Sequence, residues 1–178
     1  MKNYIYFFLF LFFFRIDFNL YSDSIHLYRE TIYEIDSNLT KRDLSKINSV
    51  LELLIQSVID KDKNKLLGLV SQKDGIFIEE NSYKTFQEFE RDLNDTNSYI
   101  DIFFFDTEKL IQHTKNLNSK TVRDLLILSG GIFYELYIDS RTQVTIKFKF
   151  SKNKIWEKEL NQAILKKDNL KWYLFKIF

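Results

Sequence analysis

Residues 132–150, IFYELYIDSRTQVTIKFKF, decide the fold class because apolar and polar side chains alternate along them with a period of two. This period predicts half-buried β-strands, since successive side chains of a strand point to opposite faces. Polar residues at 139–141 interrupt the alternation and predict a tight turn. The stretch therefore predicts a β-hairpin. The residues expected on its apolar face are Ile132, Tyr134, Leu136, Ile138, Val144, Ile146, Phe148 and Phe150.

Two more strands are expected downstream of this hairpin. Residues 151–154 predict a turn, after which Trp156, Leu160 and Ile164 share one face of a strand. A polar turn at 167–169 then leads into a last strand with the sequence WYLFKIF, residues 172–178. Four consecutive strands joined by short polar turns predict an antiparallel meander.

The residues before this sheet show helical periodicity. Thr40-Lys41-Arg42-Asp43 has the Thr-x-x-acid form of a capping box, and apolar residues follow it at steps of three and four. This pattern predicts an amphipathic helix over residues 41–60. We expect Asp62 to cap a second, short helix that ends at a turn formed by residues 74 and 75, and IFIEE, residues 76–80, to form a strand.

Two further capping boxes, TFQE at residues 85–88 and TVRD at residues 121–124, predict two more helices, the second ending at the glycines 130 and 131. Residues 98–114 are ambiguous: Ser98 and Asp101 favour a helix cap, whereas IDIFFF favours a strand. Helices followed by consecutive strands predict an α+β fold, with N-terminal helices packed on one face of a C-terminal antiparallel sheet.

The order of these elements resembles that of the NTF2-like superfamily. The resemblance rests on a helical pair over residues 41–71, a short strand at GIFIEE, an intervening helix and a terminal sheet ending in KWYLFKI, and it covers residues 41–178. It implies that the antiparallel sheet curves around the helices into a cone, whose mouth in this superfamily often holds a small ligand or an active site. The helix expected at 122–129 departs from the simplest version of that fold. Because many members are catalytically silent, the resemblance does not choose between binding and catalysis.

The first residues, MKNYIYFFLFLFFFR, have the form of a signal peptide. Lys2 precedes an apolar run from Tyr4 to Phe14, and this run is shorter than the roughly 20 residues that a transmembrane helix needs. We expect a signal peptide over residues 1–22, cleavage before Asp23 and a single α+β domain over residues 23–178. The mature protein would then be periplasmic or extracellular and would keep no stable transmembrane span. An uncleaved anchor and an N-terminal hydrophobic strand are the alternatives.

The composition excludes several classes of function. The chain has 45% hydrophobic and 29% charged residues, as a folded globular protein does, and no cysteine, which excludes thiol catalysis, disulfides and thiolate metal sites. Its two histidines, His26 and His113, stand far apart, and no phosphate loop or dinucleotide fingerprint is present, so no metal or cofactor is expected. Removal of residues 1–22 leaves equal numbers of acidic and basic residues, which argues against nucleic-acid binding.

Three carboxylates are the candidates for catalysis. Asp101 and Asp106 flank IFFF, and Glu135 lies within an otherwise apolar strand. A carboxylate in an aromatic pocket has a raised pKa and can transfer protons, as in NTF2-like isomerases. A plainer interpretation places Asp101 at a helix cap and Glu135 on the half-exposed face of the sheet.

Two hypotheses of function follow. The leading one is an exported, non-catalytic binding or interaction module whose partner is an unknown protein or a small apolar ligand. The alternative is a small NTF2-like enzyme that uses one of the three carboxylates for proton transfer. A structural component of the cell envelope is a third hypothesis.

Overall fold

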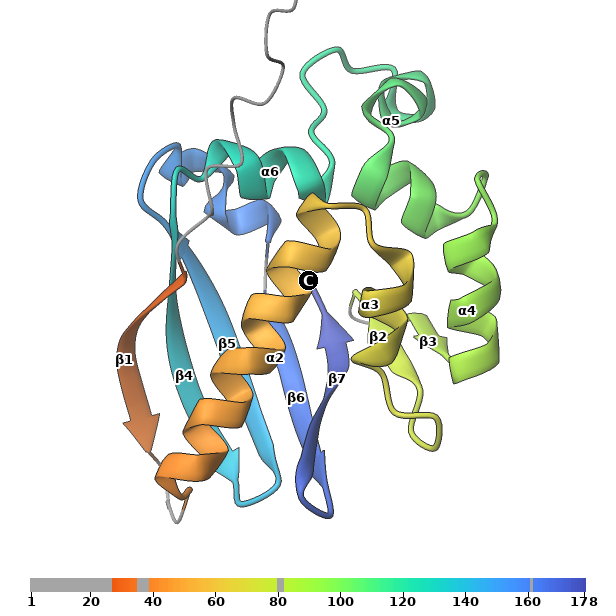
Figure 1. The fold of residues 1–178 in the computed structure, drawn as a ribbon. Helices are drawn as coiled ribbons and strands as arrows, with labels where there is room; N and C mark the ends of the chain where they lie inside the picture. Colours follow the sequence, from red (N-terminus) through yellow and green to blue (C-terminus); the bar gives the residue numbers. More distant parts are fainter. Residues whose placement is uncertain (1–26, 35–38, 80–81, 161) are drawn as a thin grey trace, which may run out of the picture.

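The computed structural model describes residues 27–34, 39–79, 82–160 and 162–178 of the chain (Figure 1). The expected signal peptide, residues 1–22, lies outside the described residues, as does His26. In chain order the elements are β1 (Leu27–Glu34), α2 (Lys41–Ile59), α3 (Lys63–Gly68), β2 (Ile76–Ile78), β3 (Ser82–Lys84), α4 (Phe86–Asn94), η1 (Asp101–Phe105), α5 (Thr107–Thr114), α6 (Val122–Leu128), β4 (Ile132–Ser140), β5 (Gln143–Phe150), η2 (Lys154–Glu159), β6 (Gln162–Asp168) and β7 (Lys171–Ile177).

The fold is α+β, with a seven-stranded sheet in the order β1-β4-β5-β6-β7-β2-β3. The predicted meander is confirmed for β4 to β7, whose neighbours pair antiparallel. The expectation of a wholly antiparallel sheet is wrong, because β1 pairs with β4 and β2 pairs with β7 in parallel. Parallel pairs need long crossover connections, here through helices, so no local turn signal announces them.

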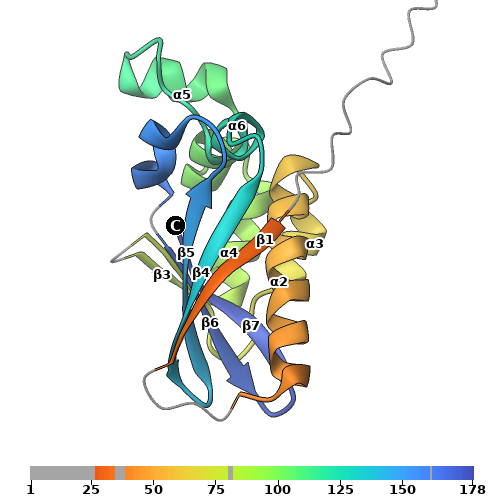
Figure 2. The ribbon, with the colours of Figure 1, turned by 90° about the vertical axis from the view of Figure 1, so that its left-hand side faces the viewer.

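Helix α2 covers one face of the sheet. Figure 2 shows α2 and α3 together on one side of the strands. The hydroxyl of Tyr134 on β4 donates a hydrogen bond to Asn48 Oδ1 on α2. The apolar side chains of α2 that are buried there are Ile47, Val50, Leu51, Leu54, Ile55 and Val58. The side chains of β4 to β7 that alternate towards α2 are buried as well, and together these residues form the hydrophobic core.

The capping box of α2 also binds the end of the sheet. The backbone N–H of Asp43 donates to Thr40 Oγ1 at 3.1 Å, as predicted. Beyond that prediction, Asp43 Oδ1 accepts hydrogen bonds from Lys167 Nζ at 2.8 Å and from Trp172 Nε1 at 3.1 Å. One buried carboxylate therefore joins the first turn of α2 to β6 and β7.

The ambiguous segment, residues 98–114, is helical. Residues Asp101–Phe105 form a π-helical turn, in which the backbone N–H of Asp106 donates to the carbonyl of Asp101 at 3.0 Å, and α5 follows. A strand there would need a partner in the sheet, whereas this segment packs its phenylalanines into the core from outside the sheet. The capping boxes at Thr85 and Thr121 are both confirmed.

The strand expected from Trp156 to Ile164 is wrong in its first half. Residues Lys154–Glu159 form a 3₁₀ helix, and β6 begins only at Gln162. Asn153 adopts a left-handed conformation at φ 54° and turns the chain out of the sheet after β5. Trp156 therefore leaves the sheet and reaches the pocket described below.

Candidate functional site

A pocket of about 930 Å³ lies where the chain ends of β2 and β7 meet η1, α5, α6 and η2. Because β2 and β7 run parallel, their last residues, Ile78 and Ile177, reach the same edge of the sheet and form its floor. Its other lining residues are Glu79, Ser82, Tyr99, Phe103, Phe104, Leu110, Thr114, Asn116, Asn118, Ser119, Lys120, Val122, Leu125, Trp156, Glu159 and Phe178.

Aromatic rings from three parts of the chain form the pocket walls. The rings of Tyr99 and Phe103, four residues apart at the start of η1, stack with centroids 4.2 Å apart. The ring of Phe104 lies 6.1 Å from that of Phe178, beyond the end of β7. Trp156 of η2 is half-buried and adds the third part. Single-turn π-helical segments often occur at functional sites, and this one places two aromatic side chains in the pocket.

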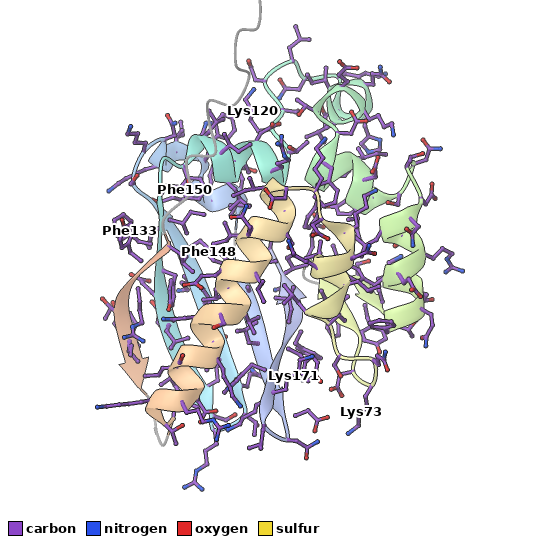
Figure 3. The ribbon with its side chains drawn as sticks, in the orientation of Figure 1. Lys73, Lys120, Phe133, Phe148, Phe150 and Lys171 are labelled. Atoms are coloured by element: carbon purple, nitrogen blue, oxygen red, sulfur yellow. The ribbon has the colours of Figure 1, made fainter. Side chains whose placement is uncertain are left out.

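Polar side chains lie around the aromatic walls. Glu79 follows β2 in a left-handed conformation, φ 57°, and its Oε1 accepts a hydrogen bond from the Tyr99 hydroxyl. Burial raises the pKa of Tyr99, and the bond to Glu79 raises it further, so this phenol stays protonated. Glu159 of η2 is an exposed carboxylate, and Lys120, labelled in Figure 3 beside α6, is half-buried.

Asp101 is an ion-pair centre rather than a pocket residue. Its carboxylate is 12% exposed and binds Lys63 of α3 at 2.9 Å and Lys109 of α5 at 3.1 Å. Burial raises the pKa of Asp101, but the hydrogen bonds and charges of the two lysines prevail and leave it below its usual range. The carboxylate therefore stays ionised at neutral pH and joins three helical elements.

Asp106 and Glu135 also lie outside the pocket lining. Asp106 caps α5 through a hydrogen bond from the backbone N–H of Lys109 at 3.0 Å, and this bond lowers the pKa of its carboxyl. Glu135 accepts a hydrogen bond from the Tyr137 hydroxyl at 2.9 Å on the half-exposed side of β4. The structure brings none of the three candidate carboxylates together with the aromatic pocket. Proton transfer by them stays a prediction without a substrate site.

His113 contacts an aromatic ring. Its ring meets that of Phe103 edge-on at 5.5 Å. Within the described part of the chain, no group of three histidine or carboxylate side chains could hold a metal ion. Nor does any helix there have the length and apolar character needed to cross a bilayer.

The face of the sheet opposite α2, here called the outer face, carries aromatic rings and lysines. The rings of Tyr33 and Tyr137 stack at 4.6 Å, and those of Tyr28 and Phe133 at 5.3 Å, with Phe133 beside β1 in Figure 3. Lysine ammonium groups lie over several rings. The pairs are Lys147 over Tyr137 at 4.8 Å, Lys166 over Phe175 at 3.3 Å and Lys171 over Tyr173 at 4.6 Å. Because these ammonium groups lie over the ring faces, part of the aromatic surface of the outer face is covered.

None of the residues that line the pocket was singled out as a site candidate from the sequence, Glu79, Tyr99, Glu159 and Phe178 included. Trp156 was expected inside a strand. These five residues come from four separate segments, since Trp156 and Glu159 both belong to η2, and only folding brings the segments to one edge of the sheet. The run of aromatic residues in IDIFFF was the nearest signal, since it supplies Phe103 and Phe104.

Comparison with protein-family models finds none that matches this chain, and comparison with curated proteins finds no match. The chemistry of the pocket is therefore the best guide to function, because a fold alone does not specify one.

Proposed function

We propose that this chain is an exported, non-catalytic binding module that takes a small, largely apolar ligand in the pocket. The observation that carries the proposal is the aromatic-lined hollow of about 930 Å³ at the edge of the sheet. Ligand sites in proteins are typically concave, roughly 300–1,000 Å³ in volume, and lined by apolar and aromatic side chains with a few polar groups.

Two observations favour a small ligand over a protein docked on the sheet. The rings of the outer face stack on one another, and lysines lie over three of them, which reduces the apolar surface left for a partner. The pocket, in contrast, presents half-buried rings of Phe103 and Trp156 beside open space. Its placement at the joined ends of β2 and β7 supports an NTF2-like arrangement in which the ligand occupies the cone mouth.

Ligand-observed saturation-transfer NMR with a library of small apolar and amphipathic compounds tests this proposal. We expect binders that lose their signal in Asn118→Phe, because a ring at this exposed lining position occupies the pocket. Asn64→Phe on α3 is the matched control, since Asn64 is exposed and lies outside the lining. If no compound binds, or if binders are unaffected by Asn118→Phe, the proposal is rejected.

Export is proposed from residues 1–22 and has its own test. N-terminal sequencing of the natural protein after cell fractionation should recover a chain that begins at Asp23 from the periplasm or the medium. Recovery from the cytosol with Met1 retained would reject export and would leave the pocket proposal standing.

A further inference from the structure

The pocket lining carries more negative than positive charge. Glu79 lies at the end of β2 and Glu159 at the end of η2, and Lys120 is the single lysine or arginine among the lining residues that the structure describes. An excess of carboxylates lowers the electrostatic potential of a cleft whose walls have a low dielectric constant. This charge pattern disfavours an anionic ligand.

Lys120 is, in addition, electrostatically engaged with a neighbouring carboxylate. It precedes the N-cap of α6 and contributes to the lowered pKa of Asp124, which also has hydrogen bonds with Thr107 and Thr121 that prevail over the effect of burial. The negative charge of Asp124 therefore offsets part of the positive potential that Lys120 produces. Lys120 thus neutralises only part of the negative charge of Glu79 and Glu159.

Aromatic faces add a second attraction for positive charge. Tyr99, Phe103 and Trp156 line the same pocket as the two glutamates. The face of an aromatic ring attracts a cation within about 6 Å of its centroid, and pockets with several rings bind alkylammonium groups. The hydrogen bond from the Tyr99 hydroxyl reaches Glu79 Oε1, which holds one carboxylate beside one of these rings.

We infer that the ligand of this pocket is an amphipathic organic cation, and this inference rests on the proposed function. Its ammonium group lies over the face of the Tyr99 ring that is not stacked on Phe103, beside the Glu79 carboxylate, and Glu159 adds electrostatic attraction. Its apolar body packs against Phe103, Phe104 and Phe178. A ligand of this class satisfies both the charge and the apolar character of the lining.

Three matched probes test the inference by saturation-transfer NMR and isothermal titration calorimetry. They are (4-phenylbutyl)trimethylammonium, its neutral isostere with a tert-butyl group in place of trimethylammonium, and the anion 5-phenylpentanoate. We expect the cation to bind about fivefold more tightly than the neutral isostere. The anion should bind most weakly, and the preference for the cation should shrink as salt rises.

Charge-neutralising variants assign the effect to the pocket. Glu79→Gln and Glu159→Gln should each weaken binding of the cation by about two- to fivefold and leave the neutral isostere unchanged. Glu90→Gln on α4, an exposed glutamate outside the lining, is the matched control and should change neither. Circular dichroism and thermal melting confirm that each variant is folded.

The outcomes separate this inference from the proposed function. Binding of the isostere or the anion as tightly as the cation, abolished by Asn118→Phe, overturns the cation inference and keeps the binding proposal. Cation binding that is unaffected by both glutamine variants also overturns the inference. Absence of binding for all three probes and for the compound library removes both.

Discussion

Replacing Asp43 with alanine is expected to destabilise the protein more than any other single carboxylate substitution considered for this chain. The side chain is 9% exposed and bonds to Lys167, Trp172 and Thr40 at once. Its loss removes the reciprocal half of the capping box, in which the Asp43 carboxylate accepts from Thr40, and the tie from α2 to β6 and β7. The N-cap bond from the backbone N–H of residue 43 to Thr40 Oγ1 is kept. The first turn of α2 is then no longer hydrogen-bonded to the end of the sheet.

The size of the effect can be worked from these contacts. Loss of the hydrogen bond from Thr40 Oγ1 to the Asp43 carboxylate costs about 1 kcal/mol. A buried Trp172 N–H without an acceptor costs a further ~1–3 kcal/mol. Lys167, whose side chain is 19% exposed, loses its carboxylate partner, which costs about 1 kcal/mol more because water still reaches its ammonium group. We therefore expect a loss of about 3–5 kcal/mol for Asp43→Ala and a smaller loss for Asp43→Asn, which still offers Trp172 an acceptor.

Acid should remove the same contribution from the unmodified protein. Burial raises the pKa of Asp43, but hydrogen bonds from Lys167, Trp172 and Thr40 prevail and hold it well below the usual range. A group whose pKa is lowered by folding stabilises the native state above its unfolded pKa, about 3.9. That stabilisation is lost as the pH falls from about 5 towards the folded pKa. The stability of Asp43→Asn should therefore depend less on pH in this range.

Urea unfolding, followed by circular dichroism, measures both effects. With a slope of about 2 kcal/mol per molar urea, Asp43→Ala should lower the midpoint by about 2 M. Asp60→Asn removes an exposed carboxylate at the other end of α2 and should change stability by less than about 0.5 kcal/mol. A loss below about 1 kcal/mol for Asp43→Ala, or identical acid profiles for the wild type and Asp43→Asn, would refute this reasoning.

Three further substitutions distinguish structural from functional roles, and urea unfolding with probe titration measures each. Asp101→Asn should lower the free energy of unfolding by about 1–3 kcal/mol, because Lys63 and Lys109 lose their ionised partner, and probe binding should stay unchanged. A loss of binding with normal stability would instead show that Asp101 belongs to the binding site. Glu135→Gln should alter stability by less than about 0.5 kcal/mol and leave binding intact, and a larger change in either contradicts its placement on the outer face. Gly75→Ala should lower the free energy of unfolding by more than about 2 kcal/mol, because Gly75 has φ +63° and the added Cβ would lie 2.3 Å from the carbonyl oxygen of Lys84. An unchanged urea midpoint would contradict this prediction and show that the turn can move to accept the Cβ.

The local sequence determined the helices that begin with capping boxes and the central hairpin. Thr40, Thr85 and Thr121 each bond to the residue three positions later, so each signal is complete within four residues. Residues 132–150 likewise carry their own alternation and their own turn, and β4 pairs with β5 as they predict. These elements follow from contacts between near neighbours in the chain.

Tertiary structure alone decided the parallel pairs, the course of the chain after β5 and the pocket. β2 is separated from β7 by five helical elements and four strands, so its register depends on long-range packing that no short pattern encodes. That pairing places Glu79 beside the end of β7, where its backbone N–H donates to the carbonyl of Ile177 at 3.2 Å, and the 3₁₀ turn at η2 brings Trp156 to the pocket that Phe178 also lines. A binding surface assembled from separate segments depends on how the whole chain buries its apolar side chains, because only that burial fixes which distant residues meet.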